Sequence, residues 1–137
     1  MKSDSSKKII QMFRHTNASA ITLKVSDKFD LIRGGRLSDL SIAYETWGSL
    51  NSDKSNVIVI FTGLSASSHV TSSSTDQTPG WWESVVGKEK AINTKDHYVI
   101  CVNTLGSCFG STSPVSINKL SYKNFLLRFP FTSILKS

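Results

Sequence analysis

The chain has 137 residues, of which 39% are hydrophobic and 19% are charged, and its formal net charge is +6. This size and composition predict one compact domain of a globular, water-soluble protein, and they exclude a disordered chain and a two-domain protein. No apolar run approaches the roughly 18 residues that cross a membrane. The apolar residues after Lys7-Lys8 are too few for a secretory signal, so we expect a cytoplasmic protein.

The positive charge lies at the two ends of the chain. Residues 1–36 hold eight Lys or Arg against three Asp, residues 37–118 hold four Lys against seven acidic residues, and residues 119–137 hold four basic residues and no acid. Residues 1–20 are polar and weakly patterned, so we interpret them as a mobile basic tail before a domain over residues 21–137. No aromatic RNA-binding motif or zinc-finger spacing accompanies these charges, so nucleic-acid binding is not predicted.

The first patterned segment has the alternation of a β-meander. Apolar residues alternate with polar ones over residues 21–33 and again over residues 37–47, which predicts two half-buried strands. Gly34-Gly35 between them predicts a hairpin turn. The positions expected to face the core are Ile21, Leu23, Val25, Leu40, Ile42 and Tyr44.

An unbroken apolar run, Val57–Phe61, dominates the middle of the chain. Its β-branched residues predict a strand with both faces buried, as in a parallel sheet covered by helices. A second run covers residues 98–103, and a glycine-containing loop follows each run. In α/β sheets ligands gather beyond the carboxyl ends of strands, where a glycine such as Gly63 lets the backbone approach them closely. The pattern predicts an α/β fold, although spacing alone also fits a buried strand with an ordinary turn.

Residues 70–78 form a long Ser/Thr-rich segment that Pro79-Gly80 closes. Loops of this length over a strand end are usually functional or disordered. Residues 81–86 predict a short helix that ends at Gly87. Two adjacent tryptophans in this segment suggest a cover over the strand ends, and ordinary packing is the alternative.

Residues 106–110 have the outline of a nucleophile elbow with Cys108 at its centre. An elbow needs a strand, a sharp turn and then a helix. Pro114 and the surrounding Ser and Thr residues oppose a helix there, so we interpret the pattern as a chance match to the elbow motif. A cysteine hydrolase remains an alternative, which Cys108→Ala would test. Cys101 is interpreted as a small buried residue, and two cysteines without nearby histidines predict neither a metal site nor a disulfide framework.

Four segments together resemble one known family. They are LSIAYETWGSLN at residues 40–51, TGLSASSHV at residues 62–70, PGWWESVVG at residues 79–87 and CVNTLGSCFGSTSPVSIN at residues 101–118. Long, ordered and correctly spaced, they resemble the amino-terminal part of the homoserine/serine O-acyltransferases. The resemblance implies an incomplete α/β-hydrolase fold, in which an antiparallel β-meander begins a mostly parallel sheet.

The resemblance implies transfer of an acyl group from acyl-CoA to the hydroxyl of L-serine or L-homoserine, through an acyl-serine, in cysteine or methionine biosynthesis. Acyl-CoA is then a co-substrate, and no bound cofactor or metal is implied. Leu64 matches the residue whose backbone N–H donates to the oxyanion. The loop that helps select the amino acid matches Gly63, Leu64, Ser65 and Ala66. TGLSASSH is more similar to the serine-acylating subgroup than to the homoserine subgroup.

The family's serine nucleophile, aspartate and histidine match no residue of this chain, which contains no G-x-S-x-G pentapeptide. Lys119, Tyr122 and Lys136 also stand where the family usually has proline, glycine and aspartate. We therefore expect a truncated segment that is inactive alone and poorly folded without its missing half. The alternative is a non-catalytic binding or interaction module derived from the same fold.

The resemblance also implies partners. These are small-molecule substrates, namely serine or homoserine and acyl-CoA, with no nucleic acid and no membrane. Full-length members are expected to be homodimers. The residues leave open whether the acyl donor carries an acetyl or a succinyl group, and which amino acid accepts it.

Overall fold

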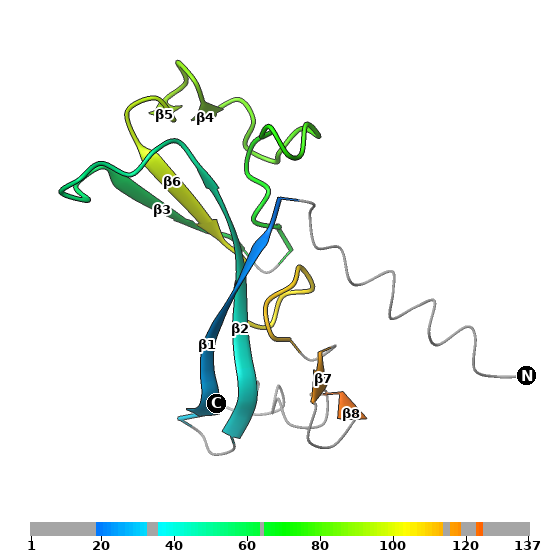
Figure 1. Cartoon of the computed structure of the whole chain (residues 1–137). Helices are drawn as coiled ribbons and strands as arrows, with labels where there is room; N and C mark the ends of the chain where they lie inside the picture. Colours follow the sequence, from blue (N-terminus) through cyan, green and yellow to red (C-terminus); the bar gives the residue numbers. More distant parts are fainter. Residues whose placement is uncertain (1–18, 33–35, 64, 114–115, 119–122, 125–137) are drawn as a thin grey trace, which may run out of the picture.

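The computed structural model describes residues 19–32, 36–63, 65–113, 116–118 and 123–124. The predicted tail and the predicted Gly34-Gly35 turn fall almost wholly outside these residues. The described residues form eight strands and no helix (Figure 1). The strands are β1 (Ile21–Asp30), β2 (Arg36–Trp47), β3 (Val57–Phe61), β4 (Val86–Gly87), β5 (Ile92–Asn93), β6 (Tyr98–Val102), β7 (Ile117–Asn118) and β8 (Lys123–Asn124).

Four of the strands form a mixed sheet in the order β1-β2-β6-β3. β1 and β2 are antiparallel, as are β2 and β6, whereas β3 and β6 run parallel with Ile60 opposite Cys101. The predicted antiparallel start and the predicted pair of apolar strands are therefore confirmed. The two runs of β-branched residues form the parallel pair because such side chains pack well on a pleated surface.

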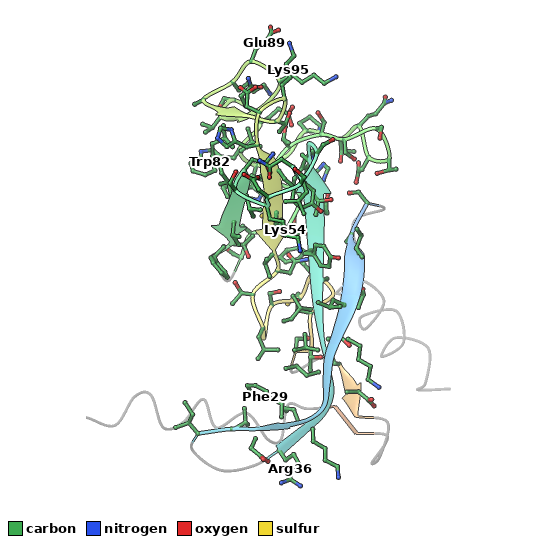
Figure 2. The ribbon with its side chains drawn as sticks, turned by 60° about the vertical axis from the view of Figure 1, so that its left-hand side comes forward. Phe29, Arg36, Lys54, Trp82, Glu89 and Lys95 are labelled. Atoms are coloured by element: carbon green, nitrogen blue, oxygen red, sulfur yellow. The ribbon has the colours of Figure 1, made fainter. Side chains whose placement is uncertain are left out.

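β1 and β2 extend beyond the rest of the sheet as a two-stranded arm (Figure 1). Only the last residues of β2, Tyr44–Trp47, pair with β6. A shift in register between Lys24 and Ser26 interrupts the pairing of β1 with β2. Figure 2 shows Arg36 at the far end of the arm and Glu89 at the opposite extremity of the molecule.

The buried face of β2 differs from the predicted one. The alternation predicted Ile42 and Tyr44 on the core side, but the structure leaves them half-buried and buries Ala43, Glu45 and Trp47. Two loops from distant parts of the sequence, residues 62–71 and 103–113, hydrogen-bond or pack onto that face. Tertiary contacts, which local alternation does not contain, decide which face is buried.

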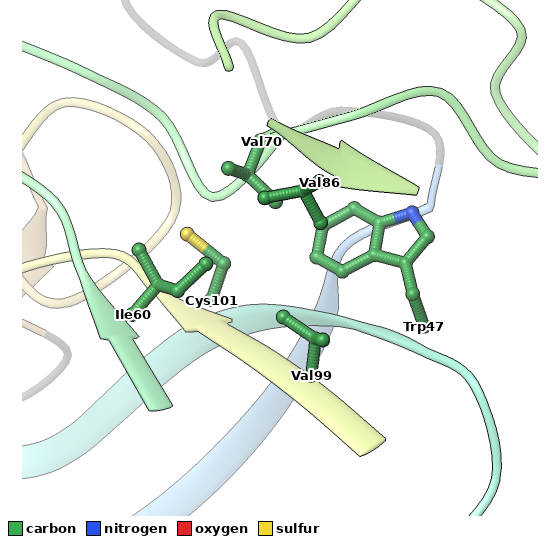
Figure 3. Packing of buried hydrophobic residues seen from close by; sticks show 6 residues of the cluster. All are labelled: Trp47, Ile60, Val70, Val86, Val99 and Cys101. Atoms are coloured by element: carbon green, nitrogen blue, oxygen red, sulfur yellow. The ribbon is translucent and has the colours of Figure 1, made fainter. Parts of the chain in front are cut away.

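The main core lies on one face of β3 and β6. It consists of Trp47, Ile60, Val70, Val86, Val99 and Cys101. Figure 3 shows Val70 and Val86 placed over the strand residues, with the ring of Trp47 beside Val86. Cys101 is fully buried, as predicted, and burial together with the charge of Glu45 raises the pKa of its thiol to about 12. A smaller cluster on the arm contains Leu37 and Leu40.

Two rows of apolar side chains remain exposed on the sheet. They are Ile21, Leu23 and Val25 of β1, and Val57, Val59 and Phe61 of β3. Phe61 is the most exposed of them, at 77%. The expectation that Ile21, Leu23 and Val25 face the core is wrong. The prediction that both faces of β3 are buried is therefore wrong for the described residues, because no helix among them covers that face.

The predicted helix over residues 81–86 does not form. The segment makes successive turns, in which the Val86 N–H donates to the Trp82 carbonyl at 3.1 Å, and then continues directly into β4. β4 pairs with β5, and this pairing places the side chain of Val86 in the core. Where a second helical turn was expected, the chain instead enters β4 and places Val86 in the core.

The buried and the exposed face of the parallel pair predict losses of stability of very different size for the same substitution. We expect Val99→Thr to lower the free energy of unfolding by about 1–2 kcal/mol, because Val99 is fully buried in the apolar main core, where the added hydroxyl is removed from water. The same change at Val59, which is 47% exposed, should alter it by less than about 0.5 kcal/mol. Urea unfolding followed by tryptophan fluorescence measures both. Equal losses would contradict the described burial.

Candidate functional site

Two loops follow the carboxyl ends of β3 and β6 and meet at one edge of the sheet. We call residues 62–69 the first loop and residues 103–113 the second loop. The Thr62 hydroxyl donates to the Val102 carbonyl at 3.2 Å, and the Thr104 hydroxyl donates to the Thr62 carbonyl at 2.7 Å. These bonds join the loops where the parallel strands end, which is where α/β sheets bind ligands.

The first loop contains the predicted substrate-binding residues. Leu64 lies outside the described residues, so its oxyanion-hole role stays a prediction. The Ala66 N–H donates to the Gly63 carbonyl at 3.4 Å and forms a turn. Ser65 and Ala66 line a hollow of about 350 Å³, but Gly63 does not. The other residues that line this loop hollow are Ser67, His69, Pro79, Gly80, Trp81 and Phe109.

Trp81 lies against the first loop. Its indole N–H donates to the Ser67 carbonyl at 2.8 Å, and its backbone N–H donates to the His69 carbonyl at 3.3 Å. The rings of Trp81 and Trp82 stack with centroids 5.4 Å apart. The indole of Trp81 therefore forms part of one wall of the loop hollow, consistent with the cover that the sequence suggested.

A buried polar network fixes the end of the first loop to β2. Glu45 is 1% exposed, and its two carboxylate oxygens accept from the Ser68 hydroxyl at 2.9 Å and contact His69 Nδ1 at 2.9 Å. The Ser19 hydroxyl donates to the same carboxylate. Asn103 of the second loop donates to the Ser68 hydroxyl at 3.1 Å. One carboxylate thus holds side chains from several distant segments together.

Burial by itself lowers the pKa of His69. Its hydrogen bonds to the Glu45 carboxylate and the Thr78 carbonyl, with the negative charges of Glu45 and Asp76, outweigh that effect and hold the pKa above its ordinary value. Sequence reasoning missed both Glu45 and His69 as parts of this site. The available signal was the position of Glu45 on a predicted strand, where it shares one face with Ala43 and Trp47.

The second loop is held against β2 by hydrogen bonds from its own side chains. The Ser111 hydroxyl donates to the Asn103 carbonyl at 2.7 Å and accepts from the Ala43 N–H at 3.0 Å. The Thr112 N–H donates to the Ser41 carbonyl at 2.8 Å. These Ser and Thr residues, which the sequence marked as opposing a helix, pair with β2 instead.

Cys108 does not have the surroundings of a nucleophile. No helix follows Gly110 in the described part of the second loop, and Cys108 is exposed there. The ring nitrogens of His69 bond Glu45 and Thr78, and Nδ1 of His97 contacts the Asn93 carbonyl at 3.3 Å. Neither histidine is bonded to Cys108, which supports the interpretation that residues 106–110 match the elbow motif by chance.

A larger hollow of about 880 Å³ lies at the opposite edge of the sheet, around the carboxyl end of β2. Trp47 and Glu83 are among its lining residues. Glu83 accepts from the backbone N–H groups of Gly80 and Ser72 at 2.9 and 2.7 Å, and these bonds outweigh partial desolvation and lower its pKa to about 2. Glu83 therefore holds both ends of the segment from Ser72 to Gly80 in place. Pro79 and Gly80 of this segment line the loop hollow.

The lowered pKa of Glu83 predicts a pH-dependent contribution to stability. The contribution is complete above the ordinary carboxyl pKa of 4.5 and is lost as the pH falls toward 2. We expect Glu83→Gln to cost about 1 kcal/mol at pH 7, because the side chain is 35% exposed and solvent weakens its bonds. Urea midpoints at pH 7 and pH 2.5 measure the difference, which should shrink at the lower pH. Glu89→Gln, at an exposed pair with Lys95, is the control and should be nearly silent.

The described part of the chain contains neither metal-binding groups nor membrane-spanning helices. No group of three or more His, Cys, Asp or Glu side chains among those residues is arranged to hold a metal ion. No helix found there is long and apolar enough to cross a membrane.

No family model matches the chain, but individual proteins do. The serine O-succinyltransferase of Litchfieldella anticariensis is 49% identical over 104 residues, and that of Schizosaccharomyces pombe is 50% identical over 101 residues. These stretches cover 76% and 74% of this chain, and 28% and 20% of the relatives. The chain thus spans less than a third of the length of the curated relatives that it matches.

Solved structures agree with these relatives. The homoserine O-acetyltransferase of Bacillus anthracis matches with a TM-score of 0.71 and 30% identity, over 81% of this chain and 31% of that protein. This chain belongs to the homoserine/serine O-acyltransferase family. Esterase E22 matches equally well, with a TM-score of 0.71 and 34% identity, over 81% of this chain and 32% of the esterase. The mixed sheet of this O-acyltransferase family member is part of an α/β-hydrolase fold, as predicted.

Proposed function

We propose that this chain is part of an amino-acid O-acyltransferase, which moves an acyl group from an acyl-CoA to the hydroxyl of L-serine or L-homoserine. In this proposal the Leu64 N–H donates to the acyl oxygen, while Gly63, Ser65 and Ala66 help select the amino acid. The observation that carries the proposal is the loop hollow at the carboxyl ends of β3 and β6, in a chain 49% identical to a serine O-succinyltransferase.

The size and lining of the loop hollow support an amino-acid acceptor. About 350 Å³ accommodates a small amino acid, whereas acyl-CoA is much larger and must lie mostly outside. Ser65 and Ser67 supply polar groups for the ammonium and carboxylate, and Trp81 and Phe109 supply an apolar wall. Polar groups beside an apolar wall can orient a small ligand that carries both kinds of group.

The chain by itself is proposed to be inactive. Acyl transfer through a covalent intermediate needs a nucleophile within hydrogen-bond reach of a base. The 137 residues contain no G-x-S-x-G pentapeptide, and the ring nitrogens of His69 bond Glu45 and Thr78. We propose that the nucleophile, its base and the orienting aspartate lie outside these residues.

The proposed partners follow from the reaction. They are serine or homoserine and an acyl-CoA, with no bound cofactor, no nucleic acid and no membrane. We also propose a cytoplasmic location, and a homodimer for the full-length protein.

An esterase is the second candidate function. It differs in the acceptor, because water replaces the amino-acid hydroxyl in attack on the acyl-enzyme, and in the donor, which is a carboxylic ester that releases an alcohol in place of a CoA thioester. The similarity to esterase E22, at 34% identity and a TM-score of 0.71, favours it. Release of free carboxylic acid without an O-acylated amino acid would identify this activity.

One assay separates these functions. The chain alone, and the chain joined to the remaining portion of the L. anticariensis relative, are incubated with succinyl-CoA or acetyl-CoA and with serine or homoserine. We expect O-acyl amino acid from the joined protein and none from the chain alone. Acylation of a serine on the chain alone would contradict the proposed inactivity. Absence of any transfer by a folded joined protein would favour the non-catalytic module.

A pair of substitutions tests the loop hollow in the joined protein. Ala66→Trp fills the hollow, so we expect it to raise KM for the amino acid at least about ten-fold. Ala91→Trp is the matched control, since Ala91 is exposed between β4 and β5 and does not line the hollow. Equal KM values for Ala66→Trp and the unaltered protein would place the amino acid elsewhere.

A further inference from the structure

Both ring nitrogens of His69 face oxygen atoms. Nδ1 lies 2.9 Å from Glu45 Oε2, and Nε2 lies 2.8 Å from the Thr78 carbonyl oxygen. The Thr78 hydroxyl also lies 3.2 Å from Nε2, but it donates its proton to Asp76 Oδ1 at 2.6 Å. Both oxygens therefore act as acceptors toward Nε2, so Nε2 carries a proton. The remaining question is whether the proton between Nδ1 and the carboxylate belongs to His69 or to Glu45.

The surroundings of the carboxylate favour the proton on His69. Hydroxyl groups of Ser19 and Ser68 donate to Glu45, and donors to a carboxylate stabilise its ionised form. An imidazole is also intrinsically more basic than a carboxylate, by about two pKa units. The pair therefore consists of an imidazolium and a carboxylate, buried together.

The charged groups that face His69 are negative. Glu45 of β2 and Asp76 of the following loop both act to keep the proton on the ring. Asp76 accepts from the Thr78 N–H at 3.1 Å and its hydroxyl at 2.6 Å, which fixes the turn that presents the Thr78 carbonyl. From β6, Cys101 contributes a neutral thiol, because burial and Glu45 raise its pKa to about 12.

We propose that His69 is a positioning residue, whose doubly protonated ring clamps the first loop between β2 and the Asp76–Thr78 turn. His69 lines the loop hollow and is 6% exposed, so its two donors define where the carboxyl end of the first loop lies. Loss of either proton leaves a nitrogen lone pair facing an oxygen, the Glu45 carboxylate at Nδ1 or the Thr78 carbonyl at Nε2, and breaks one side of the clamp. The clamp belongs to this chain's own fold, and only its effect on acyl transfer rests on the proposed function.

Nitrogen-15 NMR of the labelled chain, joined to the remaining portion of the L. anticariensis relative so that it folds, tests the protonation state directly. The chain has three histidines, and His69→Gln identifies the signals of His69 by their loss. At pH 7 we expect protons on both His69 ring nitrogens, and their loss only well above the pH at which an exposed histidine titrates. A single neutral tautomer at pH 7 in the folded chain would overturn the proposal.

Hydrogen exchange tests the clamp. After correction for intrinsic rates, we expect the protection of the first-loop amides to fall at least about ten-fold between pH 6 and pH 9 in the unaltered joined protein. His69→Gln should remove this pH dependence, whereas His97→Gln should leave it intact, because His97 contacts the Asn93 carbonyl and not the first loop. A packing role alone would give protection that does not vary with pH, and that result would also overturn the proposal.

The joined protein tests the consequence for transfer. We expect His69→Gln to lower kcat/KM near pH 7 and to remove a fall in rate on the alkaline side that the unaltered protein shows. If the joined protein is inactive but the NMR and exchange results hold, the proposed function fails and the clamp stands. If transfer occurs with an identical pH profile in the variant, the positioning role fails alone.

Discussion

Replacing Glu45 with alanine is expected to destabilise the chain by about 3 kcal/mol at pH 7. Glu45 is 1% exposed and bonds Ser68 and His69 at 2.9 Å each. Its removal leaves a buried imidazolium without its counter-charge, and leaves a buried hydroxyl without its acceptor. Uncompensated buried charge is among the most costly changes in a protein interior. Urea unfolding at pH 7, followed by tryptophan fluorescence, measures the loss.

The matched control for this variant is Glu89→Ala. Glu89 also contacts a basic side chain, Lys95 at 2.5 Å, but its own side chain is 77% exposed (Figure 2). Exposed ion pairs contribute between about 0 and 1 kcal/mol because water screens the charges. The loss at Glu45 should shrink as the pH rises, because the raised pKa of His69 means that its charged form stabilises the fold below the ordinary pKa and less above it. A loss that does not change between pH 6 and pH 9 would contradict the charge pairing.

Replacing Gly80 with alanine is expected to cost about 3 kcal/mol and to disturb the loop hollow. A Cβ at this position would lie 2.2 Å from the Thr71 N and from the Val70 carbonyl carbon, both backbone atoms. Backbone atoms cannot rotate away as a flexible side chain would, so the two segments must separate. That separation would weaken the bond from the Trp82 N–H to the Val70 carbonyl, now 2.9 Å, and displace Val70 from the core.

Gly63→Ala is the control for this substitution, because nothing lies within 4 Å of its added Cβ. We expect it to change the free energy of unfolding by less than about 0.5 kcal/mol. Urea unfolding of both variants, with limited proteolysis of the 70–80 segment, measures the effect. Equal stabilities would show that Gly80 does not lie against the backbone of residues 70–71.

Elements built on continuous runs were predictable. Val57–Phe61 and residues 98–102 form strands because β-branched side chains in short apolar runs favour the extended, pleated backbone. The segment after Trp81 was not predictable in the same way. Its local pattern permits a helix, and the hydrogen bonds of its first turn form, but the place of Val86 in the core draws the chain into β4. Tertiary packing often overrides weak local preference.

The candidate site was predictable only in part. The position of the first loop, after a buried strand and with Gly63 at its start, follows from the apolar run and its end. The Glu45–His69 pair was not foreseen, because the two residues are 24 positions apart and belong to different segments. Neither residue has a local pattern that marks the other as its partner.

The amino-acid sequence by itself determined the four strands of the main sheet and the loops that follow β3 and β6, because these depend on local apolar patterns and on where those patterns stop. Its quoted segments also predicted the family to which the chain belongs. Only the tertiary structure decided which face of β2 is buried, and that Glu45 and His69 share a buried contact beside the loop hollow. The reason is that burial of a charged side chain becomes favourable only when partners from distant segments reach it, and sequence spacing does not record that meeting.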